Sequence, residues 1–191
     1  MTLIIDKIKC VEESDESGAD DIYLIAFIGR TVAPFRSALR SIGPGGAWSD
    51  FDTGETHTSD VSAELFSASD AVYAVMMVEK DSSKDITGSA VVGAWQAQTD
   101  LIWKSIMLGM VAGGIATGTE AAKITGFAGI RNALNGLASI YMEFPKGDDD
   151  VIDVERVTIT NPGQSQTIRF RSPSNQEDAT YDVTFKHTAN V

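Results

Sequence analysis

The sequence predicts a mainly β protein, an antiparallel β-sandwich that carries a Gly/Ala-rich helical hairpin. Short segments with the apolar or alternating patterns of strands occupy both ends of the chain, separated by polar turns. A segment between them, about residues 99–143, has no proline, little alternation and small residues at intervals of four. We therefore expect a single domain over residues 1–191, with the sandwich in 1–98 and 146–191 and the hairpin insertion in 99–145.

Four segments of the first half have strand character. In residues 6–10, Ile8 and Cys10 alternate with lysines, which predicts a strand with a buried cysteine. Residues 22–29 are apolar on both faces, as a fully buried strand is. Two further strands are expected at residues 71–79 and 86–95, and residues 43–48, which contain three glycines and a proline, are expected to form a turn.

The C-terminal part repeats the strand pattern three times, at residues 151–160, 166–172 and 179–187. Turn-rich segments separate these strands. In the last one, the odd-numbered residues from Tyr181 to Phe185 are apolar or aromatic and share one face, whereas the even-numbered residues are polar. This alternation predicts a sheet with one buried and one exposed face.

The helical segment is expected to form two helices, at about residues 100–117 and 119–142, with a break near Thr117–Thr119. Each glycine inside a helix costs about 1 kcal/mol relative to alanine, so close packing must offset the glycines of this segment. Small residues let two helix backbones approach closely, in lipid and in protein assemblies. The residues predicted to contact a membrane or a second copy are Trp103, Gly109, Gly113, Gly114 and Gly118. For Trp103, core packing at the junction of sandwich and hairpin is the alternative interpretation.

Composition excludes several classes of function. Acidic residues outnumber basic ones, 27 to 15, and a net charge of −12 argues against nucleic acid as a partner. It also argues against simple electrostatic binding to anionic lipid, unless a metal reverses the local sign. One cysteine allows no internal disulfide and no Cys-rich zinc site. Residues 113–118 have the glycine spacing of a phosphate loop but lack the lysine that follows it, so we expect no nucleotide.

The first ten residues are too short and too charged for the apolar region of a signal peptide. We expect synthesis in the cytoplasm, in a bacterial cell, with release by lysis or by a signal-independent route left open. No G-x-S-x-G elbow occurs, and no carboxylate pair is singled out by the sequence, so we expect a protein that is not an enzyme.

Two acidic loops are candidates for a cation site. They are DESGADDIY, from Asp15 to Tyr23, and EKDSSKDITG, from Glu79 to Gly88, each expected between two strands. Calcium prefers six to eight oxygen ligands on flexible loops, and loops at one end of a sandwich can converge. The alternative is a pair of solvated acidic turns. A third acidic run, at residues 148–150, is either a further part of the site or an unrelated turn.

Over about residues 1–95 the chain resembles the C2 domain, a calcium-binding β-sandwich. The first loop has the spacing of that family in Asp15, Gly18, Asp21 and Tyr23, although Ile22 replaces the customary proline. The second loop is similar to the family's third calcium loop, with glutamate in place of its first aspartate. The calcium ligands that the resemblance implies are Asp15, Asp21, Glu79, Asp81 and Asp85.

The functions that the sequence leaves open differ in the role they give to the helical segment. Residues 105–119 carry no charge, but fifteen helical residues span about 22 Å, less than the roughly 30 Å of a bilayer core, so we expect a protein that is soluble at rest. Three roles are open for the hairpin. It could be a static layer that covers the sandwich, a segment that inserts into membranes as in a small pore-forming toxin, or the surface through which copies of the chain assemble. We expect a non-enzymatic, calcium-dependent protein that binds membrane lipid or a protein partner. The alternative is a self-assembling structural subunit of a homo-oligomer or filament.

Overall fold

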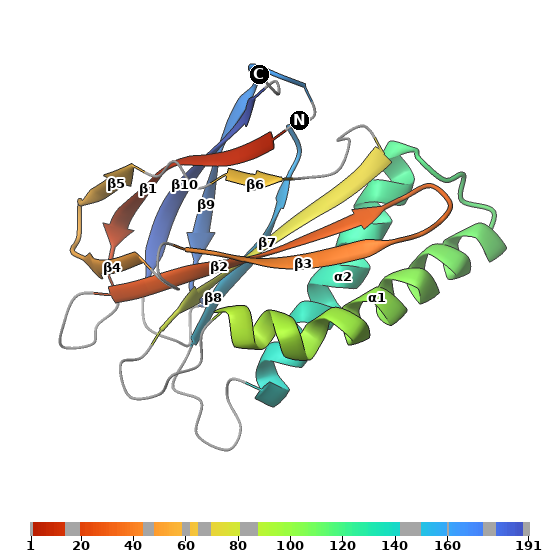
Figure 1. Cartoon of the computed structure of the whole chain (residues 1–191), viewed down its shortest axis with the longest axis horizontal. Coiled ribbons are helices and arrows are strands. Elements are labelled where there is room, and N and C mark those ends of the chain that lie inside the picture. The colour runs from red at the N-terminus through yellow and green to blue at the C-terminus, as the bar shows by residue number, and fades with distance from the viewer. Residues whose placement is uncertain are drawn as a thin grey trace.

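Two antiparallel β-sheets and two helices form three layers in the described part of the chain (Figure 1). The computed structural model describes residues 2–13, 20–43, 48–58, 62–64, 70–80, 88–141, 150–159, 161–173 and 179–188. A mainly β, sandwich-like architecture with two helices is thereby confirmed.

We call the first sheet sheet A. Its strands run in the order β5-β1-β10-β9, and β6 also pairs with β1. The bounds of these strands are β1 Thr2–Glu12, β5 Thr56–Thr58, β6 Ser62–Glu64, β9 Ser165–Arg171 and β10 Thr180–Thr188.

The second sheet, sheet B, has the order β3-β2-β7-β8, and β4 also pairs with β2. Its strands are β2 Asp20–Arg30, β3 Ser37–Ile42, β4 Trp48–Phe51, β7 Ala71–Glu79 and β8 Asp150–Val157. The helices α1 (Gly88–Ala112) and α2 (Glu120–Tyr141) pack on the face of sheet B that points away from sheet A (Figure 1). The predicted hairpin that covers one face of the sandwich is therefore present.

The sequence patterns of the two sheets follow from what covers them. Sheet B lies between two apolar layers, because Leu24 belongs to the core against sheet A and Ile25 to the core against the helices. All but the last residue of β7 are buried for the same reason. Among the described residues, only the inner face of sheet A is covered by another layer, so Tyr181 and Val183 of β10 are buried and Lys186 is exposed. These predicted strands are confirmed, and Cys10 is buried as expected.

Helix α1 begins earlier than the sequence predicted. It starts at Gly88, so the predicted strand at residues 86–95 and the predicted start of the hairpin at residue 99 are wrong. Helix α1 ends at Ala112 rather than at residue 117, whereas the observed α2 agrees with the predicted range of 119–142. The buried residues of α1 recur every three or four positions, which places them on one face of a helix. They are Gly88, Val91, Trp95, Thr99, Trp103, Met107 and Met110.

The connection between the helices is fixed by backbone hydrogen bonds. Gly114 has a positive φ of 80°, and the N–H of Ile115 donates to the carbonyl of Met110, 2.9 Å away, which together end α1 in a Schellman motif. The N–H of Gly118 donates to the carbonyl of Thr31 at the end of β2. The hydroxyl of Thr119 accepts from the N–H of Ala122, which caps the start of α2.

Trp103 joins the helices to sheet B. Its side chain is fully buried, and its indole N–H donates to the carbonyl of Arg30 at 2.9 Å. A Cβ at Gly29 of β2 would lie 2.5 Å from the indole ring, and a Cβ at Gly126 of α2 would lie 2.8 Å from it. Only glycine fits at both positions, because the ring occupies the space of a Cβ.

The glycines that the sequence singled out do not pack the helices together. No described atom comes within 4 Å of a Cβ built at Gly109 or Gly114, and a Cβ at Gly113 would meet only the backbone of its own helix. A Cβ at Gly118 would lie 3.1 Å from Cγ1 of Val32, which follows β2 and is not part of either helix. These glycines therefore do not bring α1 and α2 together within the chain, and their contact with a membrane or a second copy stays a prediction. Trp103 is buried in the core, as its alternative interpretation expected.

Candidate functional site

Three acidic side chains stand at one end of sheet B, where β2 begins, β7 ends and β8 begins. Ile22 of β2 pairs with Glu79 of β7, and Glu79 pairs with Asp150 of β8. The N–H of Lys80 donates to the carbonyl of Asp21, 2.6 Å away, which holds the two strand ends together. We call Asp21, Glu79 and Asp150 the acidic end.

Strand register decides which of these carboxylates share a face. Glu79 and Asp150 are directly opposite each other, so their side chains leave the sheet on the same side, with Cβ atoms about 5 Å apart. Asp21 precedes the residue that pairs with Glu79, and successive residues of a strand point to opposite faces. Like charges directly opposite each other destabilise a sheet, and a bound cation would remove that repulsion.

The structure places two of the five predicted calcium ligands at this end of sheet B. Asp21 and Glu79 lie on neighbouring strands, and Asp150, from the third acidic run, is directly opposite Glu79 on β8. Asp15, Asp81 and Asp85 lie outside the described residues. Within the described ranges, no group of three or more His, Cys, Asp or Glu side chains is arranged to hold a metal ion.

The second acidic loop does not connect two strands, contrary to the prediction. It follows β7 and leads into α1, which begins at Gly88. The Val and Ala residues after Gly88 suggested a strand, but Val91 lies on the buried face of α1, whereas Ala90 and Ala94 are exposed. This loop therefore differs in its surroundings from the third calcium loop of a C2 domain.

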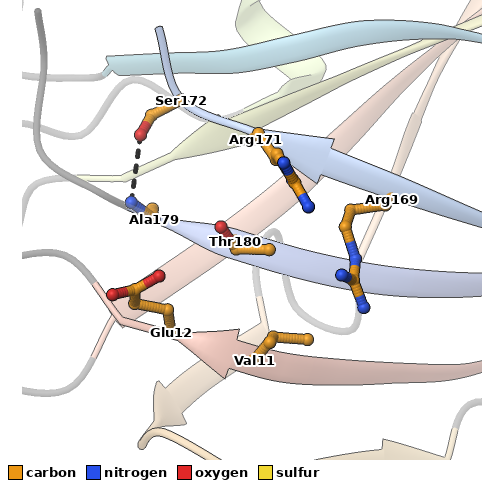
Figure 2. A pocket seen from close by; sticks show the side chains of 7 residues that line it. All are labelled: Val11, Glu12, Arg169, Arg171, Ser172, Ala179 and Thr180. Atoms are coloured by element: carbon orange, nitrogen blue, oxygen red, sulfur yellow. Dashed lines mark hydrogen bonds between the residues drawn. The ribbon is translucent and has the colours of Figure 1, made fainter. Parts of the chain in front are cut away.

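A hollow of about 490 Å³ lies at one end of sheet A, over the ends of β1 and β9 and the start of β10. Figure 2 shows Arg169 and Arg171 side by side on β9, with Thr180 on β10 and Glu12 on β1. The hydroxyl of Ser172 accepts a hydrogen bond from the N–H of Ala179 at 3.0 Å. The sequence reasoning missed this hollow, although the R-F-R alternation of β9 places both arginines on its exposed face.

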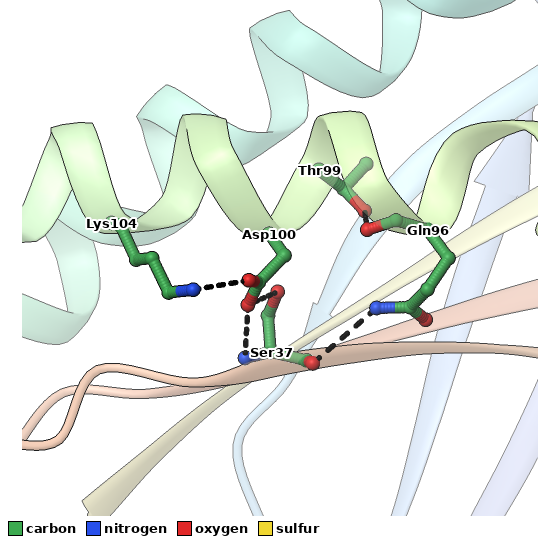
Figure 3. A network of polar contacts seen from close by, with 5 residues as sticks. All are labelled: Ser37, Gln96, Thr99, Asp100 and Lys104. Carbon is green, nitrogen blue, oxygen red and sulfur yellow. Dashed lines mark hydrogen bonds and ion pairs between the residues drawn. The ribbon is translucent and has the colours of Figure 1, made fainter.

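A polar network closes the outer edge of β3 (Figure 3). The amide oxygen of Gln96 accepts from the N–H of Leu39 at 2.7 Å, and the carboxylate of Asp100 accepts from the N–H of Ser37 at 3.1 Å. Burial acts to raise the pKa of Asp100, but hydrogen bonds from Lys104 and Ser37 outweigh it and hold this pKa below its ordinary value. Side chains of α1 thus satisfy edge groups that would otherwise be open to another strand.

The two histidines of the chain lie apart from these regions. His57 on β5 stacks against Phe51, with ring centroids 4.2 Å apart. His187 on β10 is buried, and burial, followed by the charge of the N-terminal amine, lowers its pKa. Both positions indicate packing roles.

Neither α1 nor α2 combines the length and the apolar character that a membrane span requires. Five large apolar side chains of the described residues are nevertheless exposed, all of them on these helices. They are Leu101, Leu108, Val111, Ile124 and Ile140.

Comparison with protein-family models, with curated proteins and with solved structures finds no match for this chain.

Proposed function

We propose that this chain is a non-enzymatic binding protein that holds calcium at the acidic end and contacts its partner in a calcium-dependent manner. The observation that carries the proposal is the direct pairing of Glu79 with Asp150, with Asp21 on the adjacent strand. Carboxylate oxygens are the ligands that calcium prefers. In sequence, further acids directly follow or precede these strand ends, which favours a site completed by loop residues.

A C2-like arrangement is part of this proposal. Two antiparallel sheets with acidic residues gathered at one end support it. The helix pair that follows β7 is a departure from that family, so we assign the site from the register of β2, β7 and β8 and not from the resemblance alone.

We do not extend the proposal to pore formation, because α1 and α2 pack on sheet B as one layer of the core. Leaving sheet B would expose the apolar face of the sheet and break the contacts of several fully or nearly fully buried side chains of α1 and α2, and each buried side chain is worth about 1.5–3 kcal/mol. Their sum is comparable with the entire stability of a typical domain, roughly 5–15 kcal/mol. They include Trp95, Trp103, Met107, Ile130 and Leu134.

Thermal melts test the calcium proposal. The protein is melted with EDTA, with millimolar calcium and with millimolar magnesium. A ligand present at a hundred times its dissociation constant, bound only to the native state, stabilises by about 2.7 kcal/mol, which raises the Tm of a chain of this size by about 5–10 °C. We expect that rise with calcium and a smaller one with magnesium.

Two double variants locate the site. Glu79→Gln with Asp150→Asn should remove the calcium-dependent rise in Tm, whereas the control Asp6→Asn with Glu120→Gln, which neutralises two carboxylates elsewhere, should keep it. Each variant is compared with its own melt in EDTA, so its intrinsic stability cancels. The proposal fails if calcium does not raise the Tm of the unmodified chain, or if the first variant responds as strongly as the control.

A further inference from the structure

A third of the basic residues of this acidic chain lie on one surface. Five of the fifteen basic residues extend from the outer face of sheet A, which the helices do not cover, and all five are exposed. We call this surface the basic face. It consists of Lys7 and Lys9 on β1, Arg169 and Arg171 on β9, and Lys186 on β10.

Strand register sets the positions of these charges. Lys9, Asp182 and Arg169 lie in one row across β1, β10 and β9, and the next row ends in Arg171. Neighbouring strands are about 4.8 Å apart, and residues two apart on a strand are separated by about 6.7 Å. The basic face is therefore an array of cations spaced about 7–10 Å apart, and the hollow beside Arg171 lies at its end (Figure 2).

Only part of this charge is neutralised within the described residues. Both guanidinium N–H groups of Arg169 that face Asp182 donate to its carboxylate, at 2.7 Å each. The hydrogen bond from Arg169 holds the pKa of Asp182 below its ordinary value, and the charges of Lys9 and Arg171 add to this effect. The five cations thus stand against the carboxylates of Asp182 and, in the row of Arg171, Glu12, so cations outnumber acids among these side chains although the net charge of the chain is −12.

The acidic end and the basic face lie toward the same end of the molecule. Strand β1 ends at Glu12, in the row of Thr180 and Arg171, and β2 begins at Asp20 only a short segment later. A two-fold axis near this end can place the acidic end of one copy against the basic face of the other, and the reverse. Closed two-fold pairs are the commonest oligomers.

We propose that the basic face binds the acidic end of a second copy of this chain. The two copies then form a two-fold symmetric homodimer (the pair) with two equivalent contacts. Opposite charges of the two copies then meet at short range. Repulsion between their remaining acids is screened beyond about 8 Å at physiological ionic strength.

Charge and polarity favour a second copy over a membrane or a nucleic acid. A uniform polyanion repels a chain of net charge −12 from most directions, whereas a second copy presents charges of both signs and attracts in one orientation. A membrane contact would also be expected to use exposed apolar side chains, and in the described residues the large ones lie on the helices, not on this face.

Sedimentation velocity tests this proposal with EDTA present throughout, so the result does not depend on the calcium proposal. At low salt we expect a species of twice the 20.4 kDa mass of the chain, which dissociates as salt is raised to 0.5 M. The basic-reversed variant, Lys9→Glu with Arg171→Glu, and the acid-reversed variant, Glu79→Lys with Asp150→Lys, should each be monomeric.

Mixing these two variants provides the decisive result. In the mixture every contact again joins opposite charges, so a 1:1 pair should form although neither variant pairs alone. A pair formed on mixing also shows that both variants are folded.

The control Arg36→Glu with Arg40→Glu reverses two exposed charges outside the basic face and should pair like the unmodified chain. The milder variant Lys9→Gln with Arg171→Gln should weaken pairing by about tenfold or more.

The proposal is overturned if the unmodified chain stays monomeric at low salt, or if the mixture of reversed variants does not pair while the neutral variant pairs normally. A separate arm uses vesicles of anionic phospholipid with the same variants. If the chain is a monomer that binds these vesicles, and the Lys9 and Arg171 variants abolish this binding, the basic face binds lipid and the proposed pair is equally overturned.

Discussion

Gly126→Ala is predicted to destabilise the protein, although alanine is the better helix former. Its Cβ would lie 2.8 Å from Cη2 of Trp103, well inside normal contact distance. The indole ring has little room to move away. The ring also contacts Gly29, where a Cβ would be 2.5 Å from Cε2, its N–H donates to the carbonyl of Arg30, and it forms a T-shaped pair with the ring of Phe27 at a centroid distance of 5.3 Å.

A matched glycine isolates the size of the effect. At Gly109, also inside a helix, no described atom lies within 4 Å of the added Cβ, so alanine should stabilise by about 1 kcal/mol. Gly126→Ala gains the same propensity but overpacks the core, at a cost of about 1–3 kcal/mol. The two variants should therefore differ by about 2 kcal/mol, which corresponds to a difference in Tm of about 4–8 °C for a chain of this length.

Thermal melts followed by circular dichroism and by tryptophan fluorescence measure this difference. Gly29→Ala, with its closer contact and no helical propensity to gain, should be the least stable of the three variants. Replacing Trp103 by phenylalanine in the Gly126→Ala protein should recover part of the loss, because the smaller ring leaves room for the Cβ. Equal Tm values for the alanine variants at 126 and 109 would refute the conclusion that the indole ring of Trp103 leaves no room for a Cβ at position 126.

Polar contacts of α1 and β10 give two further predictions. Gln96→Ala leaves the N–H of Leu39 without its acceptor and should lower the free energy of unfolding in urea by about 1 kcal/mol, whereas Gln96→Glu, which keeps an acceptor oxygen, should lose less. For His187, the pKa in the folded protein is below its ordinary value of 6.5, so the unfolded chain binds the proton more readily. Its contribution to stability is complete above that value and is lost as pH falls from about 6.5 toward the folded pKa. His187→Gln should therefore reduce the slope of stability against pH in this window, and an unchanged slope would contradict the assignment.

The pattern of a short segment was sufficient to predict its secondary structure where the apolar residues of that segment alone show the period of a strand or a helix. The apolar run at residues 22–29, the alternation of β10 and the position of α2 were all predicted from short stretches of sequence. The first turns of α1 were misassigned because Val91 and Val92 favour a strand within a short window. The spacing of Val91, Trp95, Thr99 and Trp103 shows the helix only when the window extends across all of them. The short strands β3, β4, β5 and β6 were missed, since pairing with β1 or β2 defines them more than their own composition does.

The sequence by itself determined the acidic balance, most of the long strands and the presence of a helical pair. Tertiary structure alone decided that Glu79 faces Asp150, that Lys9 and Arg171 share one surface, and that the glycine beside Trp103 is Gly126 and not Gly109. The physical reason is the same in each case. Periodicity reports which face of an element is buried, but the partner on that face is set by strand register and layer packing between segments far apart in the chain.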